Sequence, residues 1–117
     1  MTPVADCLFC KIVAGTIPVK PLYDDEDMIV IQDINPQAPL HVLVIPKTHI
    51  PSLNDLTSEH DALVGRMFRR AAAIAHSKGY DVRGYRTLFN TGPEAGQSVF
   101  HIHLHVLGGR HMSWPPG

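Results

Sequence analysis

Three histidines near the carboxyl end of the chain, His101, His103 and His105, alternate with apolar residues. Successive side chains of a β-strand point to opposite faces, so the three imidazoles are predicted to share one face and the apolar residues the other. The unperturbed pKa of histidine, about 6.5, leaves a neutral, nucleophilic imidazole available near neutrality. A single histidine is often a core residue that is hydrogen-bonded to the backbone, or one residue of an exposed strand face. Three histidines on the same face of one strand instead favour a catalytic site that acts on an anion.

The loop before these histidines carries Gly96, Gln97 and Ser98, residues suited to holding a phosphate. Glycine lets the backbone approach a ligand closely, the next two amides can donate hydrogen bonds, and serine adds a hydroxyl. The same three residues are also consistent with a plain turn between two strands. Their position just before the histidine strand favours a phosphate site over a site for a carbonyl substrate.

The only two cysteines, Cys7 and Cys10, form a C-x-x-C pair. At this spacing two thiolates can bind one tetrahedral zinc ion, and two further ligands are needed to close the site. A redox pair, and simple apolar contacts on a helix, are the alternatives. The pair therefore makes a structural metal site a hypothesis that depends on partners elsewhere in the chain.

Length and composition describe one ordinary globular domain, which we place over residues 1–117. The chain is 44% hydrophobic and 18% charged, with a formal net charge of -1. The chain lacks the excess of basic residues that is typical of proteins that bind nucleic acid or an anionic membrane, so neither is expected as a partner. No apolar run reaches the roughly 20 residues of a membrane span, and residues 1–6 do not resemble a signal peptide. We therefore expect a cytoplasmic protein.

Helical and strand-like patterns together predict an α+β fold. A short helix is expected over residues 7–14, with Asp6 as its N-cap and Gly15 at its end. Turn residues and runs of apolar or β-branched residues separate the strands. The predicted strands are residues 19–23, 28–32, 41–45, 85–90 and 100–107.

A long helix is predicted over residues 58–78, because apolar side chains recur on one stripe. Ser58 and Asp61 resemble a capping box, and Gly79 can end the helix. The tail after residue 107 has no regular pattern, but Trp114 is expected to bury its ring. The apolar stripe consists of Leu63, Met67, Phe68, Ala71, Ile74 and Ala75, and the histidines left without a function are His60, His76 and His111.

Residues 101–107 resemble the His-φ-His-φ-His-φ-φ motif, with φ apolar, of the histidine triad (HIT) family. The resemblance extends over nearly the whole chain, and the tail residues 107–110 and 114–117 are similar to the Hint branch, the purine nucleoside phosphoramidases. It implies the HIT fold, a five-stranded antiparallel sheet with one long and one short helix. It also implies a homodimer that joins two sheets into a larger one and places Trp114 near the partner's site.

The resemblance further implies roles for individual residues. His103 becomes the nucleophile that takes a nucleotidyl group, His105 and His41 complete the histidine cluster, and His101 is its outer member. Cleavage in two displacements, first by imidazole and then by water, fits this arrangement. Ser98 matches the family serine that lies near the leaving-group nitrogen, and Asp33 matches the acidic residue that binds the ribose hydroxyls. The residues that match phosphate contacts are Asn90, Gln97 and Val99, the last through its backbone amide. The apolar residues that either form the wall of the purine site or belong to the simple core are Phe9, Ile12, Ile17, Ile34 and Leu43.

Several bacterial members of this family are similar in a further respect, because they pair two cysteines with two histidines. Here these are His49, in the segment Ile-Pro-Lys-Thr-His, and His101. The resemblance thus implies a structural Zn²⁺ on Cys7, Cys10, His49 and His101. If zinc holds His101, that side chain is structural rather than catalytic. No organic cofactor and no catalytic metal are expected.

The expected activity is hydrolysis of adenosine 5'-phosphoramidates or aminoacyl-adenylates to a nucleoside monophosphate. Hydrolysis of dinucleoside polyphosphates is the alternative that uses the same nucleophile with a larger leaving group. A nucleotide-binding regulatory module with incidental hydrolysis and a zinc-binding scaffold are the alternatives from other classes. Substrate, leaving group and the choice between adenosine and guanosine are left open by the residues.

Overall fold

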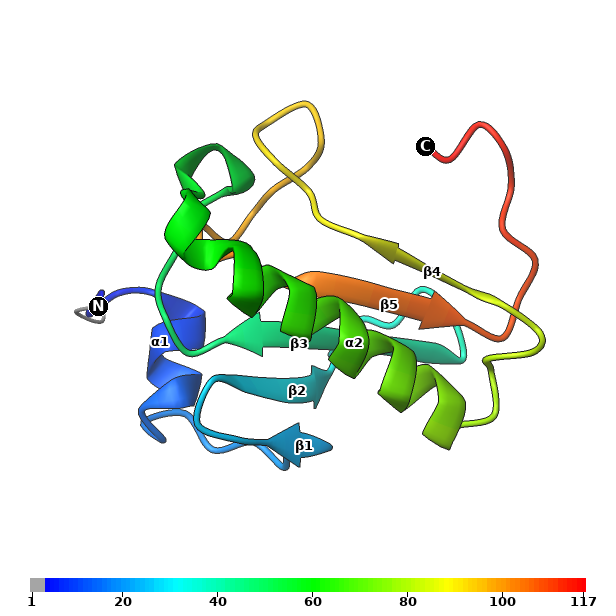
Figure 1. Cartoon of the computed structure of the whole chain (residues 1–117), viewed down its shortest axis with the longest axis horizontal. Helices are drawn as coiled ribbons and strands as arrows, with labels where there is room; N and C mark the ends of the chain where they lie inside the picture. Colours follow the sequence, from blue (N-terminus) through cyan, green and yellow to red (C-terminus); the bar gives the residue numbers. More distant parts are fainter. Residues whose placement is uncertain (1–3) are drawn as a thin grey trace.

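One five-stranded antiparallel sheet forms the centre of the molecule, in the order β1-β2-β3-β5-β4, which confirms the predicted α+β class (Figure 1). The computed structural model describes residues 4–117. Among them no helix is long and apolar enough to cross a membrane. The helices are α1 (Leu8–Val13) and α2 (Asp61–Ser77), and the strands are β1 (Tyr23–Asp24), β2 (Met28–Gln32), β3 (Leu40–Pro46), β4 (Tyr85–Leu88) and β5 (Leu104–Gly108).

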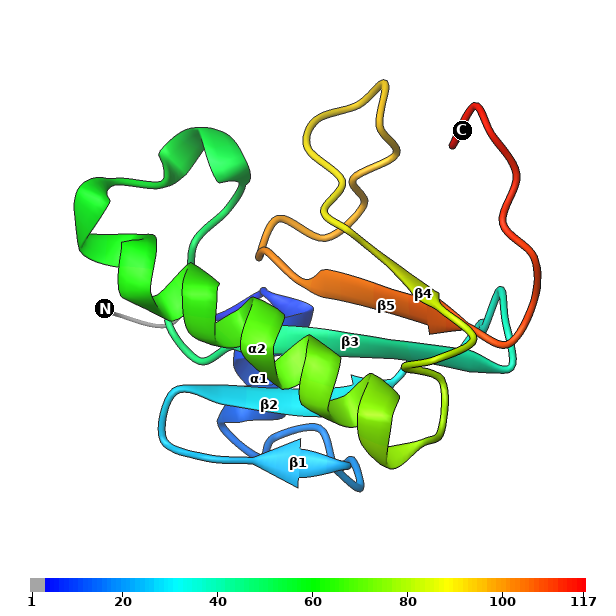
Figure 2. The same ribbon diagram turned by 45° about the vertical axis from the view of Figure 1, so that its right-hand side comes forward.

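The two helices cover opposite faces of the sheet, as the two views in Figures 1 and 2 show. The central strand β3 is buried along its whole length, because its alternate side chains enter two separate cores. Val42 and Val44 lie in the core under α2, whereas Leu43 and Ile45 lie in the core with α1. The face that carries α1 is the one that also carries the histidines.

Strand β5 begins at Leu104, so the predicted strand over residues 100–107 is too long at its start. The preceding residues leave the ladder because Ile102 donates its backbone N–H to the carbonyl of Ile50 at 2.8 Å. The predicted alternation nevertheless holds. Ile102 packs in the core under α2, and His101 and His103 both pack against Phe9 on the other face.

The first and fourth strands are also shorter than predicted. Strand β1 has two residues, because Pro21 cannot donate to a ladder and the residues before it are exposed. Strand β4 ends at Leu88 rather than Asn90. Asn90 thereby lies in the loop after the strand, beside the histidines rather than in the sheet.

Both predicted helix starts need correction. Cys7, not Asp6, is the N-cap of α1, and its Sγ accepts the N–H of Cys10 at 3.4 Å. A 3-10 turn, Ser58–His60, precedes α2, so the capping box predicted from Ser58 and Asp61 is wrong. In its place the N–H of Thr57 donates to Nδ1 of His60 at 3.0 Å. The short turn Leu53–Asp55 lies just upstream.

Two aromatic side chains expected to be buried are exposed within this chain. Trp114 is 83% exposed, so the prediction that it buries its ring is wrong for a single chain. Phe68 belongs to the predicted stripe of α2 but is 44% exposed, with its ring edge against Phe89. In a single copy of the chain, these two aromatic side chains therefore leave apolar surface exposed to solvent.

Candidate active site

A cleft of about 670 Å³ opens on the α1 face of the sheet, beside the histidines. Strand pairing brings its parts together, because Leu43 of β3 lies opposite His105 of β5, and His41 lies opposite Leu107. Thirteen residues predicted from the sequence line the cleft. They are Phe9, Ile12, Ile17, Asp33, Ile34, Leu43, Asn90, Gly96, Gln97, Ser98, Val99, His103 and His105.

The other two histidines of the predicted cluster do not line the cleft. His41 is buried next to His105. His101 is completely buried, and its side chain belongs to the cysteine cluster. The predicted histidine cluster is therefore split into two groups with different surroundings.

His103 is held in one tautomer by the backbone. Its Nδ1 donates to the carbonyl oxygen of His101 at 2.8 Å, and because a carbonyl only accepts, the proton lies on Nδ1 and the lone pair on Nε2. The ring of Phe9 packs edge-on against it, with centroids 4.8 Å apart. Burial lowers the pKa of His103, although the carbonyl bond and the charge of Asp33 oppose the shift. A neutral imidazole with a free Nε2 lone pair is a nucleophile.

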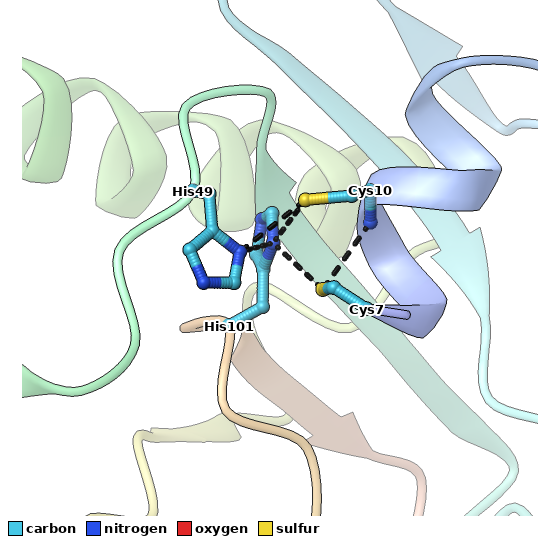
Figure 3. Close-up of side chains that lie close together, drawn as sticks. All are labelled: Cys7, Cys10, His49 and His101. Atoms are coloured by element: carbon cyan, nitrogen blue, oxygen red, sulfur yellow. Dashed lines mark hydrogen bonds between the residues drawn. The ribbon is translucent and has the colours of Figure 1, made fainter. Parts of the chain in front are cut away.

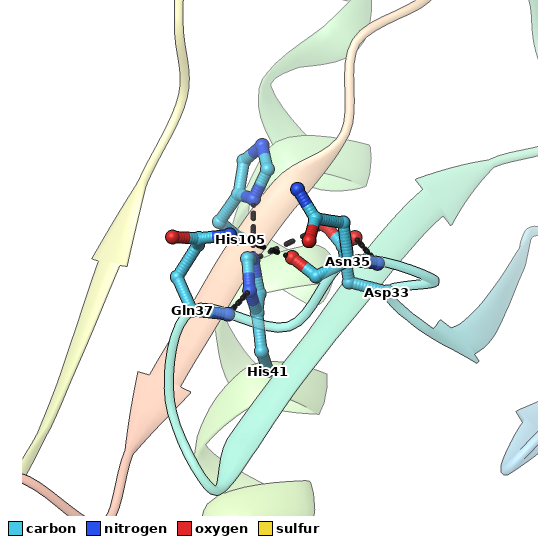
Figure 4. Close-up of polar contacts among 5 residues, drawn as sticks. All are labelled: Asp33, Asn35, Gln37, His41 and His105. Carbon is cyan, nitrogen blue, oxygen red and sulfur yellow. Dashed lines mark hydrogen bonds and ion pairs between the residues drawn. The ribbon is translucent and has the colours of Figure 1, made fainter.

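His41 and His105 form a hydrogen-bonded pair, of which His105 lines the cleft (Figure 4). The backbone N–H of Gln37 donates to Nδ1 of His41 at 2.9 Å, so neutral His41 carries its proton on Nε2. That Nε2 lies 2.9 Å from Nδ1 of His105. Burial, followed by the neighbouring His103 and His41, lowers the pKa of His105 to about 4. Burial also lowers the pKa of His41.

Asp33 lies at the end of β2 and lines the cleft. Its Oδ1 accepts the N–H of Asn35 at 2.8 Å, and its Oδ2 lies 3.3 Å from Nε2 of His41. One carboxylate therefore faces both the open cleft and the histidine pair. Ile34, the next residue, is fully exposed, so as a wall it would be covered only by a ligand.

Gln97 differs from its predicted role as a phosphate donor. Its side chain donates to the carbonyls of Pro51 at 2.7 Å and Val99 at 3.2 Å, and its Oε1 accepts the N–H of Gly92 at 3.0 Å. Its backbone N–H donates to the carbonyl of Gly92 at 3.1 Å. All its donors are occupied, so Gln97 fixes the loop that presents the exposed Ser98 to the cleft.

The two cysteines meet two histidines next to the cleft, and the four ligand atoms lie within 4.8 Å of one another (Figure 3). Nδ1 of His101 lies 3.4 Å from Sγ of Cys7 and 3.1 Å from Nδ1 of His49. Sγ of Cys10 lies 3.3 Å from Nδ1 of His49. Tetrahedral zinc with sulfur and nitrogen ligands separates its ligand atoms by about 3.3–3.8 Å.

The tautomer of His101 also fits a bound cation. Nε2 of His101 donates to the carbonyl of Pro46 at 2.7 Å, which directs its Nδ1 lone pair into the cluster. Burial is the main cause that raises the pKa of the Cys10 thiol, and a cation would reverse that preference. The four residues fit zinc by donor type, spacing and orientation.

Comparison with known proteins places this architecture in a family. The protein-family model described as "Scavenger mRNA decapping enzyme C-term binding" matches residues 6–114 of this chain. A HIT-like protein of Synechococcus elongatus is 47% identical over 112 residues, which are 96% of this chain and 97% of that protein. The chain belongs to the histidine triad family. The purine nucleoside phosphoramidase of Escherichia coli is 45% identical over 105 residues, 90% of this chain and 88% of that protein.

Solved structures of histidine triad proteins have the same fold. A HIT family hydrolase from Legionella pneumophila superposes with a TM-score of 0.93 at 46% identity, over 96% of this chain and all of that one. A zinc-bound histidine triad family protein from Mycobacterium smegmatis has a TM-score of 0.77 at 40% identity, over 93% of this chain and 78% of that one. These relatives support a nucleotide hydrolase-type enzyme.

Some lining residues of this histidine triad cleft were missed by the sequence reasoning. Helical spacing relates Leu8 to Ile12, and alternation along extended backbone relates Ile31 to Asp33, so both could have been found. Lys20 has no such signal, because it follows Pro18 in an irregular segment. The missed residues are Leu8, Pro18, Val19, Lys20, Ile31 and Gln32.

Proposed function

We propose that this protein hydrolyses purine nucleoside 5'-phosphoramidates or aminoacyl-adenylates through a nucleotidyl-His103 intermediate. The observation that carries the proposal is the hydrogen bond from Nδ1 of His103 to the His101 carbonyl, which leaves Nε2 as a lone pair at the wall of the cleft. The resemblance to the phosphoramidase of Escherichia coli supports the same reaction.

In the mechanism proposed for the phosphoramidate, Nε2 of His103 attacks the α-phosphorus. A new P–N bond to His103 forms while the P–N bond to the leaving amine breaks. The departing nitrogen takes up a proton, relayed from water by the hydroxyl of Ser98. Water then attacks phosphorus and gives its proton to the hydroxide left by the first step, the bond to His103 breaks, and the nucleoside monophosphate leaves with the imidazole neutral again.

The proposed binding mode follows the lining of the cleft. The carboxylate of Asp33 would accept hydrogen bonds from the ribose hydroxyls. The phosphate would be contacted by Asn90, Ser98 and the backbone amide of Val99. Nε2 of His105 would donate to a phosphoryl oxygen as charge develops there. The purine would lie against the apolar wall formed by Phe9, Ile12, Ile17, Ile34 and Leu43.

The test is replacement of the nucleophile. We expect His103→Ala to lower turnover of adenosine 5'-phosphoramidate by on the order of 10³-fold or more. Acid-quenched wild-type protein should carry one AMP on His103 by mass spectrometry. His76→Ala is the control, since His76 is exposed and pairs with Asp81. Undiminished turnover in His103→Ala would refute the proposal, and binding of AMP without any adduct would favour a regulatory module.

A second candidate, hydrolysis of dinucleoside polyphosphates, is favoured by one feature. A hollow of about 420 Å³ adjoins the cleft and shares Leu8, Ser98 and Val99 with it. It offers room for a leaving group larger than ammonia. Comparing kcat/KM for adenosine 5'-phosphoramidate and diadenosine triphosphate would decide between the two.

We also propose that Cys7, Cys10, His49 and His101 hold a structural Zn²⁺. Bound there, the ion would cross-link α1 to the loop after β3 and to the segment before β5. It would leave the nucleophile itself outside the coordination sphere. Its role would be to fix the wall of the cleft.

A homodimer is proposed as the assembled state. Strand β4 is the last strand of the sheet order, and Phe68 of α2 packs edge-to-face against Phe89, just after β4. A second copy that paired there would extend the sheet and cover Phe68. The exposed tail with Trp114 would then reach toward the partner's cleft.

A further inference from the structure

The tail after β5 is docked against the loop that precedes β3, behind the histidine pair. Nε of Arg110 donates to the carbonyl of Gln37 at 2.8 Å. Gly109 lies so close to this loop that a Cβ there would stand 2.8 Å from Cβ of Pro39, at a φ of 94°. Only glycine allows this approach, which brings the guanidinium of the next residue to the loop.

The peptide groups of Gln37 connect the tail to His41. The residue accepts the Arg110 bond with its carbonyl and donates its own N–H to Nδ1 of His41 at 2.9 Å (Figure 4). A backbone amide can only donate, so it accepts no proton from the imidazole. As long as this amide stays in place, neutral His41 must carry its proton on Nε2.

The orientation is passed on to His105. Nε2–H of His41 donates to Nδ1 of His105 at 2.9 Å, so neutral His105 carries its own proton on Nε2. Nε2 of His105 is buried and without a partner among the residues that the structure describes, and His105 lines the cleft. An unpaired buried donor beside a cleft is suited to an oxygen of a bound phosphate.

The opposite tautomers would be unsuited to that ligand. If the Gln37 amide moved away, His41 could carry its proton on Nδ1, and its Nε2 lone pair would face Nδ1 of His105. His105 would then place its proton on Nδ1, and its Nε2 lone pair would repel a phosphoryl oxygen. The carboxylate of Asp33, 3.3 Å from Nε2 of His41, favours the protonated Nε2 but does not hold Nδ1.

We propose that Arg110 is a positioning residue for the phosphoryl-transfer site, because its bond to the Gln37 carbonyl holds the backbone of Gln37, whose N–H sets the tautomers of His41 and His105. The inference rests on the proposed function for its catalytic consequence, but the tautomers themselves do not. Arg110 touches neither the cleft nor the reacting atoms. Its effect should therefore fall on kcat rather than on nucleotide binding.

The first experiment is ¹⁵N NMR of histidine-labelled protein without substrate, which distinguishes Nδ1–H from Nε2–H for each ring. In the wild type we expect Nε2–H at both His41 and His105, and in Arg110→Met a mixture of tautomers at both. Arg110→Lys should restore the wild-type pattern, since it can still donate to Gln37. Arg83→Met is the control, because Arg83 lines the same surface hollow as Arg110 and has no bond to Gln37.

A second pair of variants tests the amide directly if Arg110→Met does not fold. Gln37→Pro removes the N–H, and Gln37→Ala keeps it, while both lose the side-chain bond to the Asn35 carbonyl. We expect the tautomer mixture in the proline variant alone. An unchanged Nε2–H pattern in both Arg110→Met and Gln37→Pro would overturn the proposal.

The kinetic readout is turnover of adenosine 5'-phosphoramidate. For Arg110→Met we expect kcat to fall by about tenfold with KM changed less than about twofold, and Arg83→Met to match the wild type. An equal loss of kcat in Arg83→Met would overturn the assignment. A wild type that shows the expected tautomers but hydrolyses no phosphoramidate would refute the proposed function and leave the positioning role of Arg110 intact.

Discussion

His101 serves His103 through its backbone while its own side chain belongs to another site. The carbonyl of His101 accepts the Nδ1 proton of His103 at 2.8 Å, and the imidazole of His101 lies 3.4 Å from Sγ of Cys7. One residue therefore links the cysteine cluster to the orientation of the nucleophile. Phe9, between the two cysteines, contacts both imidazoles.

Removal of the thiolates should release zinc and loosen the fold. We expect the wild type to contain about one zinc per chain and the double variant Cys7→Ser/Cys10→Ser to contain almost none, with unfolding stability lower by several kcal/mol. Elemental analysis and chemical denaturation measure both quantities. His60→Ala, a histidine outside the cluster, should keep its zinc. A metal-free wild type as stable as the zinc-loaded one would contradict the site.

Phe9 should act on nucleotide binding and on stability. We expect Phe9→Leu to raise KM for adenosine 5'-phosphoramidate several-fold and to cost about 1–2 kcal/mol, because the ring packs on His103 and is buried. Steady-state kinetics and urea denaturation are the measurements. Val82→Ala, a change of an exposed side chain outside the cleft, should leave KM unaltered. Equal KM values in the two variants would argue against a nucleotide contact.

Asp33 should recognise ribose. For the wild type we expect faster turnover of the ribonucleotide than of the 2'-deoxynucleotide phosphoramidate, and for Asp33→Asn a loss of roughly tenfold in that preference. The ratio of the turnover rates of the two substrates reports the ribose contact alone, because the effect of Asp33 on His41 is the same for both substrates and cancels. Asp24→Asn is the control, since Asp24 pairs with Lys47 outside the cleft. Retained discrimination in Asp33→Asn would exclude the contact.

Acid should destabilise the fold through His105. Its folded pKa of about 4 lies below the unfolded value, so the unfolded chain binds protons more readily and stability falls as pH drops from about 6.5 toward 4. Between pH 7 and pH 5 this one group should remove about 2 kcal/mol. The loss should be smaller by that amount in His105→Asn, as measured by denaturation at both pH values with zinc held constant. Parallel losses in both proteins would show that His105 is not the responsible group.

Assembly should depend on the α2 face beside β4. We expect Phe68→Glu to shift the protein from dimer to monomer in analytical ultracentrifugation, because it places a charge in an apolar contact. Leu22→Glu is the matched control, since Leu22 is 38% exposed against 44% for Phe68 and lies at the β1 edge of the sheet. A monomeric wild type, or an unaltered dimer in Phe68→Glu, would contradict the interface.

Local spacing accounts for much of what could be predicted. The alternation of His101, His103 and His105 with apolar residues survives even where β5 has not begun, because side-chain direction in extended backbone depends on neighbouring residues alone. The C-x-x-C spacing likewise brings two thiols to one side of α1. The partner His49 was reached through the family resemblance, since no local pattern relates it to the cysteines.

The sequence by itself determined which side chains share a face, which residue types could bind a phosphate or a metal, and that the fold is α+β. Only the tertiary structure decided the tautomers of His103, His41 and His105, the full use of Gln97 within its own loop, and the contact of Arg110 with Gln37. The physical reason is the distance along the chain over which each kind of interaction acts. Periodicity acts over a few residues, whereas these hydrogen bonds join segments brought together by the pairing of β3 with β5 and by the docking of the tail.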